Sequence, residues 1–174
     1  CNYRTTPDCM PHLLDKKNVD MLTSHKVFSV PELESRCEIM LENYVKTVLI
    51  EASTMIEMAR RQILPACEKY ASYVADCAMK KCAFIEGLNC DADKALVTRL
   101  SELSSQISGK TDALASAVIK AKSISDVKKC AYSIRDSVLS AMSALRAVCD
   151  EAETVTSEEF WPFPTYGDLL FGVR

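Results

Sequence analysis

A helical pattern of apolar residues runs from residue 29 to residue 86 and limits the possible folds of this chain more than any other feature. From residue 33 to residue 66 the apolar positions are spaced by four, four and three, which is an 11-residue period, and beyond residue 66 the period becomes seven. The first period is typical of a straight or slightly right-handed helix, and the second of a left-handed coiled coil. The pattern predicts one long helix of about 56 residues, roughly 84 Å at 1.5 Å per residue.

Residues with clear conformational preferences mark this helix. Ser29 and Glu32 have the spacing of a capping box, and Pro31 lacks only an amide that would be unpaired in the first turn. Gly87 is a favourable C-terminal stop. Pro65 lies where the period changes, and we expect it to kink the helix because it lacks an amide and crowds the preceding turn. A complete break at Pro65 is the alternative.

Two shorter helices with a seven-residue apolar period follow the long one. Asp91 or Asp93 can cap the first, whose apolar seam runs from residue 96 to residue 121. Residues 123–126 have the form of a second capping box, and the last helix runs from there to about residue 155. Because a short connection joins two heptad helices of matched length, we expect an antiparallel hairpin.

Together these segments predict an all-α fold: an elongated antiparallel bundle of one long Pro-kinked helix and a two-helix coiled-coil hairpin. Residues 1–28 form a lead-in, irregular up to residue 14 and then a short helix at 16–25 that Asp15 caps. Residues 29–155 form the bundle, and residues 156–174 an irregular tail rich in aromatic residues and proline. With 4 Gly and 7% aromatic residues the chain is unlike a β-sandwich or barrel, which needs many turns and aromatic strand residues.

Composition also excludes several classes of partner. The net charge of −3 and the pI near 5.5 come with no basic stripe, so we expect no nucleic-acid binding. No uninterrupted apolar run approaches the roughly 18 residues needed to span a bilayer, so we expect no membrane insertion. The 9 cysteines have neither CxxC nor zinc spacing, and we interpret them as reduced thiols of a cytoplasmic protein; a disulfide framework is the alternative.

The sequence identifies no catalytic, cofactor-binding or metal-binding residue. Neither His12 nor His25 follows a Glu by three residues, so the Glu-x-x-His pattern of a di-iron bundle is missing. Haem-attachment, glycine-rich phosphate-binding and nucleophile-elbow motifs are missing as well. We interpret Glu57 and Arg61 as a surface ion pair, and Glu51 is a candidate for burial against an arginine such as Arg135.

The lengths of the helices do not match. Each hairpin helix has about 31 residues, roughly 46 Å, so a hairpin packed back from Gly87 is expected to leave residues 31–56 without cover. That half of the long helix is apolar on several sides, which is typical of a buried helix. We expect the rest of a larger protein or a second subunit to bury it; the alternative is that the short helix at 16–25 folds back over one side. The predicted interaction residues of this half are Ile39, Leu41, Val45, Leu49 and Ile50.

The tail from residue 160 onward is too apolar to remain disordered, so it is expected to dock. It can cap the end of the bundle by Gly87, run back along the bundle or cross to another subunit. We expect it to pack along the bundle of its own chain. The predicted interaction residues of the tail are Trp161, Phe163, Tyr166, Leu169 and Phe171.

Several stretches of sequence resemble one known family. Residues 4–8 and 10–13 are similar to the junction that follows the catalytic core of type III glutamine synthetases, and many positions from 26 to 66 resemble the segment after it. Residues 161–171 resemble the C-terminus of that family very closely, whereas residues 88–125 match only in their heptads. Since the chain begins at Cys1 without a methionine, we expect it to be a part of a longer protein, its lead-in coming from the missing core.

The resemblance implies a parent enzyme that makes glutamine from glutamate and ammonia with ATP and magnesium or manganese, and that assembles as two stacked hexamers. Its metal, nucleotide and ammonia sites would lie in the catalytic barrel upstream of Arg4, so no catalytic residue is transferred to this chain and no cofactor is expected in it. The implied role is assembly or regulation, with the upstream core and neighbouring subunits as partners. The alternative is a free-standing coiled-coil adaptor that binds partner helices through its exposed seam.

Overall fold

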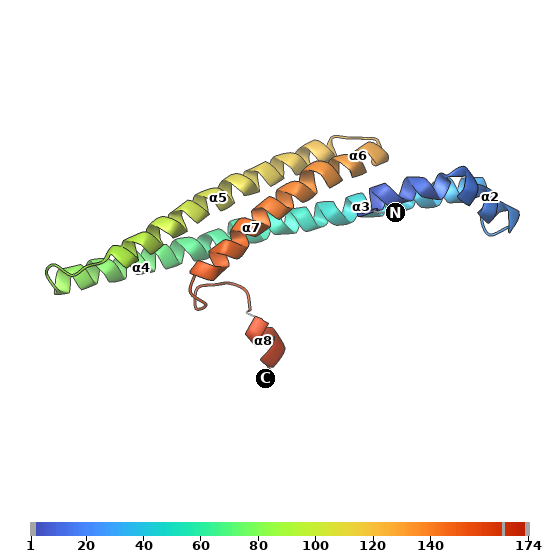
Figure 1. The fold of residues 1–174 in the computed structure, drawn as a ribbon. Coiled ribbons are helices and arrows are strands. Elements are labelled where there is room, and N and C mark those ends of the chain that lie inside the picture. Colours follow the sequence, from blue (N-terminus) through green and yellow to red (C-terminus); the bar gives the residue numbers. More distant parts are fainter. Residues whose placement is uncertain (1–2, 165, 173–174) are drawn as a thin grey trace. The chain divides into compact units, whose positions relative to one another are not determined.

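Helices make up the fold of the computed structural model, which describes residues 3–164 and 166–172 and shows no strand in that part of the chain. The predicted all-α class is confirmed. Two short segments, η2 and η3, are π-helical turns, and η1 is a 3-10 helix. In chain order the elements are α1 (Thr6–Cys9), η1 (Met10–Leu14), α2 (Lys16–Ser24), α3 (Val30–Met58), η2 (Ala59–Ile63), α4 (Leu64–Phe84), α5 (Asp91–Lys122), α6 (Val127–Ser133), η3 (Ile134–Val138), α7 (Leu139–Val155) and α8 (Tyr166–Phe171) (Figure 1).

The predicted long helix is present, and the alternative of a break at Pro65 is wrong. α3, η2 and α4 follow one another without an intervening loop from Val30 to Phe84. Pro65 has no amide to donate to the carbonyl of Arg61 four residues earlier. The π turn of η2 ends two residues before Pro65, and such wider turns are a usual way for a helix to accommodate a lost hydrogen bond. The hairpin helix after residue 126 contains a similar turn, η3, that no proline explains.

The chain divides into two compact units, each with its own core. One consists of Cys1–Thr54 and Leu114–Met142, and the other of Met55–Ala113 and Ser143–Arg174. In both, one stripe of the long helix is buried together with apolar residues of the hairpin. The buried stripe and its partners comprise Leu33, Leu41, Val48, Ala52, Leu114, Val118, Ala131, Ile134 and Val138 in the first unit, and Ala59, Ile63, Cys67, Val74, Leu100, Leu103, Ile107, Leu145, Val148 and Ala152 in the second.

The expectation that the hairpin leaves residues 31–56 without cover is wrong for one side of α3. Cys37 and Leu41 form a buried cluster with Ala131 of α6, and Val127 packs against it. Residues 123–126, which join α5 to α6, are not helical. An extended residue advances about 3.3 Å and a helical residue about 1.5 Å, so this connection carries the hairpin farther along α3 than its helix lengths alone suggest.

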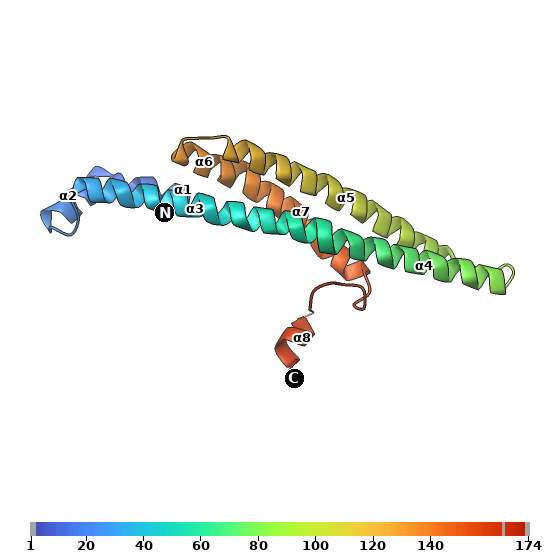
Figure 2. The ribbon, with the colours of Figure 1, turned by 180° about the vertical axis from the view of Figure 1, so that it is seen from behind.

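Several local predictions need correction at the ends of the helices. The lead-in is not irregular up to residue 14, because α1 and η1 form there (Figure 2). The cap of α6 is Asp126, whose carboxylate accepts a hydrogen bond from the amide of Lys129, rather than Ser123. The tail is helical after Pro164, where the six residues of α8 form. No helix in the described ranges has the length and hydropathy to cross a membrane.

The cores predict a sharp contrast between two isoleucines of α5. Ile107 is fully buried, whereas the side chain of Ile119 is 69% exposed. We expect Ile107→Ala to lower the free energy of unfolding by about 2–5 kcal/mol, because it leaves a cavity in a close-packed core. Ile119→Ala removes the same atoms from an exposed side chain and should change the free energy of unfolding by less than about 0.5 kcal/mol. Urea unfolding followed by circular dichroism measures both, and equal effects would contradict the assigned core.

Candidate interaction surfaces

The first surface lies on the side of α3 that faces away from its own core. Ile39 is 52% and Ile50 is 67% exposed, and Met40 beside Ile39 is exposed as well. Successive helix residues are rotated by about 100°, so Ile39 and Ile50 lie nearly opposite Leu41 and Ala52, which face the hairpin. The described residues leave these apolar side chains largely uncovered. We call Ile39, Met40 and Ile50 the outer face of α3.

The other predicted residues of this helix half lie closer to the core. Leu41 is buried in the cluster with Cys37 and Ala131, and it therefore belongs to the chain's own packing. Val45 is half-buried and packs against the same cluster, and Leu49 is half-buried too. Of the five residues predicted for this half, the structure thus leaves Ile39 and Ile50 open to a partner. Met40 was not among them, although it follows Ile39 directly in the sequence.

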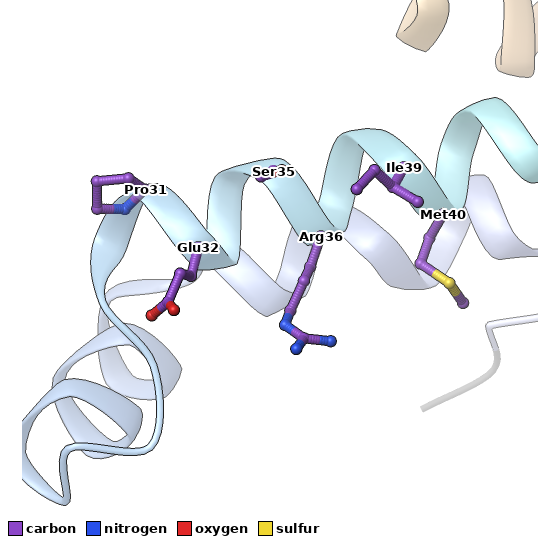
Figure 3. Close-up of a pocket in the computed structure, with 6 residues that line it drawn as sticks. All are labelled: Pro31, Glu32, Ser35, Arg36, Ile39 and Met40. Atoms are coloured by element: carbon purple, nitrogen blue, oxygen red, sulfur yellow. The ribbon is translucent and has the colours of Figure 1, made fainter.

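A shallow hollow extends the outer face toward the N-terminus of α3. Glu32, Arg36 and Met40 project from one side of the helix at intervals of four residues (Figure 3). The carboxylate of Glu32 accepts hydrogen bonds from the Ser29 amide at 2.7 Å and the Ser29 hydroxyl at 2.8 Å, and these bonds lower the pKa of Glu32. Arg36 lies over the ring of Phe28, 4.3 Å from its centroid. The rim of the outer face is therefore charged. The hollow is lined by Pro31, Glu32, Ser35, Arg36, Ile39 and Met40.

An ion-pair cluster fastens the N-terminal segment to the hairpin. The Arg135 guanidinium donates to Asp8 at 2.5 Å and to both carboxylate oxygens of Asp136, at 2.7 and 3.1 Å. Asp8 also accepts from the amide and hydroxyl of Thr5, at 3.2 and 2.7 Å. The proposed pairing of Arg135 with Glu51 is therefore wrong, and Glu51 is exposed. The Thr5-x-x-Asp8 spacing of a capping box would have located one end of this cluster.

These contacts also set the protonation of the cluster. The pKa of Asp8 lies below its ordinary value, first because the Thr5 hydroxyl donates to its carboxylate and then because of Arg135. Arg135 likewise lowers the pKa of Asp136, and its own pKa is raised by the two carboxylates, chiefly Asp136. All three groups are therefore charged at neutral pH, and the cluster holds α1 by charge-assisted hydrogen bonds.

The first half of the C-terminal tail docks on α4. The ring of Phe160 contacts those of Tyr70 and Tyr73, with centroids 5.2 and 5.3 Å away. Trp161 is half-buried, and its ring meets that of Phe163 edge-on at 6.1 Å. This half therefore packs along its own bundle, as expected. Phe160 was not among the predicted residues, although it begins the aromatic stretch.

The second half of the tail presents a second apolar surface. Leu169 and Leu170 of α8 are exposed, and Phe171 is 82% exposed. The predicted residue Tyr166 begins α8, but its side chain lies outside the described residues. Covering the three exposed large apolar side chains of this short helix would be favourable by about 25 cal/mol per Å² of buried apolar surface. We call Leu169, Leu170 and Phe171 the α8 patch.

Two buried polar atoms without a hydrogen-bond partner belong to residues that are close in sequence to these surfaces. One is the hydroxyl of Tyr44, which belongs to α3 between Ile39 and Ile50, and the other is the indole Nε1 of Trp161. Burial raises the pKa of the Tyr44 hydroxyl, so it stays protonated and can donate. An unpaired buried donor costs about 1–3 kcal/mol, which an acceptor from another part of a protein would recover.

The described part of the chain contains no cluster of potential metal ligands. Over residues 3–164 and 166–172, no group of three or more His, Cys, Asp or Glu side chains has an arrangement that could hold one. Its carboxylates are instead used in capping and in ion pairs, as at Asp8 and Asp126.

Comparison with known proteins shows that the chain is similar to one part of much longer proteins. The family described as "Glutamine synthetase C-terminal domain" matches residues 1–81. A glutamine synthetase of Butyrivibrio fibrisolvens is 31% identical over 173 residues, and a type-3 glutamine synthetase of Dictyostelium discoideum is 26% identical over 174 residues. A glutamine synthetase of Bacteroides fragilis is 27% identical over 174 residues. Each alignment covers 98–99% of this chain but only 24–25% of the relative, so the chain spans about a quarter of their length.

The docking of the tail can be tested with the fluorescence of Trp161, the only tryptophan of the chain. We expect Phe160→Ala to shift the emission of Trp161 to longer wavelength, because the tail loses its contact with Tyr70 and Tyr73 and the indole becomes hydrated. Phe171→Ala is the matched control: it removes an equal ring from an exposed position and should leave the emission unchanged. Equal spectra for both variants would contradict the docking of Phe160.

The ion-pair cluster predicts a pH dependence of α1. Because the folded pKa of Asp8 is depressed, its contribution to stability is present above the unfolded value of about 3.9 and is lost as the pH falls through the folded pKa. We expect amide-exchange protection of α1 to fall below about pH 4 in the native chain. In Arg135→Gln the protection of α1 should already be reduced at pH 7. Glu57→Gln removes an exposed pair with Arg61 and should change neither the protection of α1 at pH 7 nor its loss at low pH. Full protection of α1 in Arg135→Gln would contradict the cluster.

Proposed function

We propose that this chain, which is similar over nearly its whole length to glutamine synthetases, among them a type-3 enzyme, is the non-catalytic C-terminal region of a type III glutamate–ammonia ligase and serves the assembly or regulation of the enzyme. The parent enzyme would join glutamate and ammonia to glutamine while ATP is cleaved to ADP and phosphate. The whole reaction would be carried out outside this helical region, in the longer part of the protein that the relatives also contain.

The residues that the structure describes do not form a site for a divalent metal with its nucleotide. Magnesium and manganese prefer several carboxylate oxygens around one point. In the described segments no such group occurs, and the sequence has no glycine-rich phosphate-binding loop. We therefore assign nucleotide, metal and ammonia binding to the catalytic core of the parent protein, and we assign no catalytic residue here.

The observation that carries the proposal is the outer face of α3. Ile39, Met40 and Ile50 are exposed on a helix whose opposite side is fully packed. Fully burying an exposed isoleucine side chain is worth about 1.5–3 kcal/mol, and covering these partly exposed ones contributes a part of that, so this face favours a protein partner. We propose that the partner is the upstream catalytic core of the same chain or a neighbouring subunit in a homo-oligomer of two stacked hexamers. The charged rim at Glu32 and Arg36 would set the orientation of the contact.

The α8 patch would supply a second contact of the same kind. Phe160 anchors the start of the tail on α4, which brings Leu169, Leu170 and Phe171 out as a short apolar helix at the end of the chain. Together with Trp161 and Phe163, these residues form our proposal for the interaction role of the tail. The partner would again be a part of the same oligomeric enzyme.

A cytoplasmic location agrees with the state of the thiols. The eight cysteines in the described part of the chain are free, and five of them are buried, as is usual for thiols that behave as small hydrophobic residues. Proteins of oxidising compartments generally pair their cysteines. We propose a reducing, cytoplasmic environment for the parent enzyme.

Two isoleucines of equal exposure give a matched test of the outer face. Ile50 of α3 is 67% exposed, and Ile119 of α5 is 69% exposed. In the full-length protein we expect Ile50→Asp to break the large assembly into smaller species, because a buried carboxylate at an interface is strongly unfavourable. Ile119 has nearly the same exposure and the substitution has the same intrinsic helix propensity cost, so Ile119→Asp should leave the assembly intact. Mass photometry at nanomolar concentration measures both.

The outcomes separate the parts of the proposal. An unchanged assembly in Ile50→Asp would refute the outer face as an interface. Loss of assembly in both variants would show that the effect is not specific to this face. The isolated chain should show no ATP-dependent γ-glutamyl transfer, and measurable turnover that survives further purification would refute its non-catalytic role.

A further inference from the structure

Two cysteines meet where α4 is connected to α5. Cys82 lies in the last turn of α4, and Cys90 directly precedes α5. Their Sγ atoms are 2.7 Å apart, compared with about 2.05 Å in a disulfide bond. The two side chains are therefore already placed to form a bond with each other.

The backbone around the pair holds both residues in this position. Gly87, at φ 75°, has the left-handed conformation that turns the chain between the helices. The carbonyl of Cys90 accepts the amide of Lys94 at 3.0 Å, which fixes Cys90 to the first turn of α5. Next to the thiols, the Lys81 ammonium bonds both oxygens of Asp93, at 3.1 and 3.3 Å. These contacts thus hold the two helix ends next to each other, where a small movement of the side chains can join the two sulfurs.

The four other buried cysteines differ from this pair in the surroundings of their thiols. Cys37, Cys67, Cys130 and Cys149 are buried, and burial is the largest cause of the raised pKa of each thiol. A buried thiol with a raised pKa reacts slowly, because the thiolate is the nucleophile. Two of these thiols also donate to backbone carbonyls at 3.3–3.4 Å, Cys37 to Met10 and Cys130 to Ala121. They serve packing.

The two members of the pair have different access to solvent. Cys82 is exposed, whereas Cys90 is 4% exposed and keeps its proton longer because the hydrogen bond with Cys82 raises its pKa. Both line an open, mostly apolar groove with Ala78, Met79 and Val97. A small molecule in this groove can reach the sulfur of Cys82 directly. Cys90 can then attack only a bond that Cys82 has already formed.

We propose that Cys82 and Cys90 are a redox modification site, which a small-molecule disulfide such as oxidised glutathione converts reversibly into an intrachain disulfide. The Cys82 thiolate attacks one sulfur of the small disulfide, forming a mixed disulfide and releasing one thiolate. The Cys90 thiolate then attacks the Cys82 sulfur, forming the Cys82–Cys90 bond and releasing the second thiolate. The protein loses two electrons and two protons, and the small disulfide gains both and becomes two thiols.

The bond would tie the end of α4 to the start of α5. It closes a short loop, which restricts opening of the connection at residues 85–90. The segment is now held mainly by its turn and by the Lys81–Asp93 pair, so oxidation converts a connection that can open into a fixed one. A dithiol reductant would restore the original state.

Tryptic mapping of the full-length protein tests this directly, since cleavage after Lys81 and Lys94 leaves both cysteines in one peptide, residues 82–94. After incubation with oxidised glutathione and alkylation, we expect this peptide to be lighter by two hydrogen atoms and to carry no alkyl group. Dithiothreitol should restore two alkylation sites. Hydrogen exchange in residues 85–94 should slow by roughly tenfold or more on oxidation.

Variants give the matched controls. Cys77→Ser, one turn and a half earlier on α4, should leave the disulfide unchanged, whereas Cys82→Ser should leave Cys90 as a free thiol without a glutathione adduct. Two alkylated cysteines in the native protein after oxidation would overturn the inference. A stable glutathione adduct on Cys82 that never closes to the internal bond would overturn it as well. Rapid modification of Cys90 in Cys82→Ser would refute the order of the two steps.

Discussion

The buried stripe of the helix from Val30 to Phe84 is the constraint on which the other parts of this structure depend. Small residues recur along it, among them Ala52, Ala59, Ala66 and Ala71, and each is at most 9% exposed. Alanines let a neighbouring helix approach closely, so the hairpin can pack its larger side chains against the stripe. Since the stripe takes up one side only, the opposite side of α3 is free for something else.

Periodicity predicted the helices well because it depends on local geometry. It failed where the outcome depends on residues far apart in sequence: Asp8 and Arg135 are 127 residues apart, and no local pattern pairs them. The hairpin reaches farther along α3 than predicted because the non-helical residues 123–126 advance more per residue than a helix does. The π turn η3 contains no proline or glycine, and nothing in the sequence explains it.

The candidate surfaces could be predicted only in part, for a related reason. Ile39 and Leu41 are two residues apart and equally apolar, yet one is 52% exposed and the other 5% exposed. A helix that is apolar on several sides does not indicate which side its own hairpin will occupy, because that depends on the rotation set by the whole stripe. The Cys82–Cys90 contact was equally hidden. A spacing of eight residues brings two thiols together only through the particular conformation of the turn at Gly87.

Exposed apolar side chains and buried unpaired polar atoms are opposite kinds of imperfection, and this chain has both in the same segments. On α3 the unpaired hydroxyl of Tyr44 lies in sequence between the exposed Ile39 and Ile50, and in the tail the unpaired indole of Trp161 precedes the exposed α8 patch. Solvent alone does not remove either imperfection, because water reaches the isoleucines and not the buried donors. A protein surface that covers the apolar side chains and offers a carbonyl or carboxylate removes both at once. This combination supports the proposal that α3 and the tail make contacts within a larger molecule.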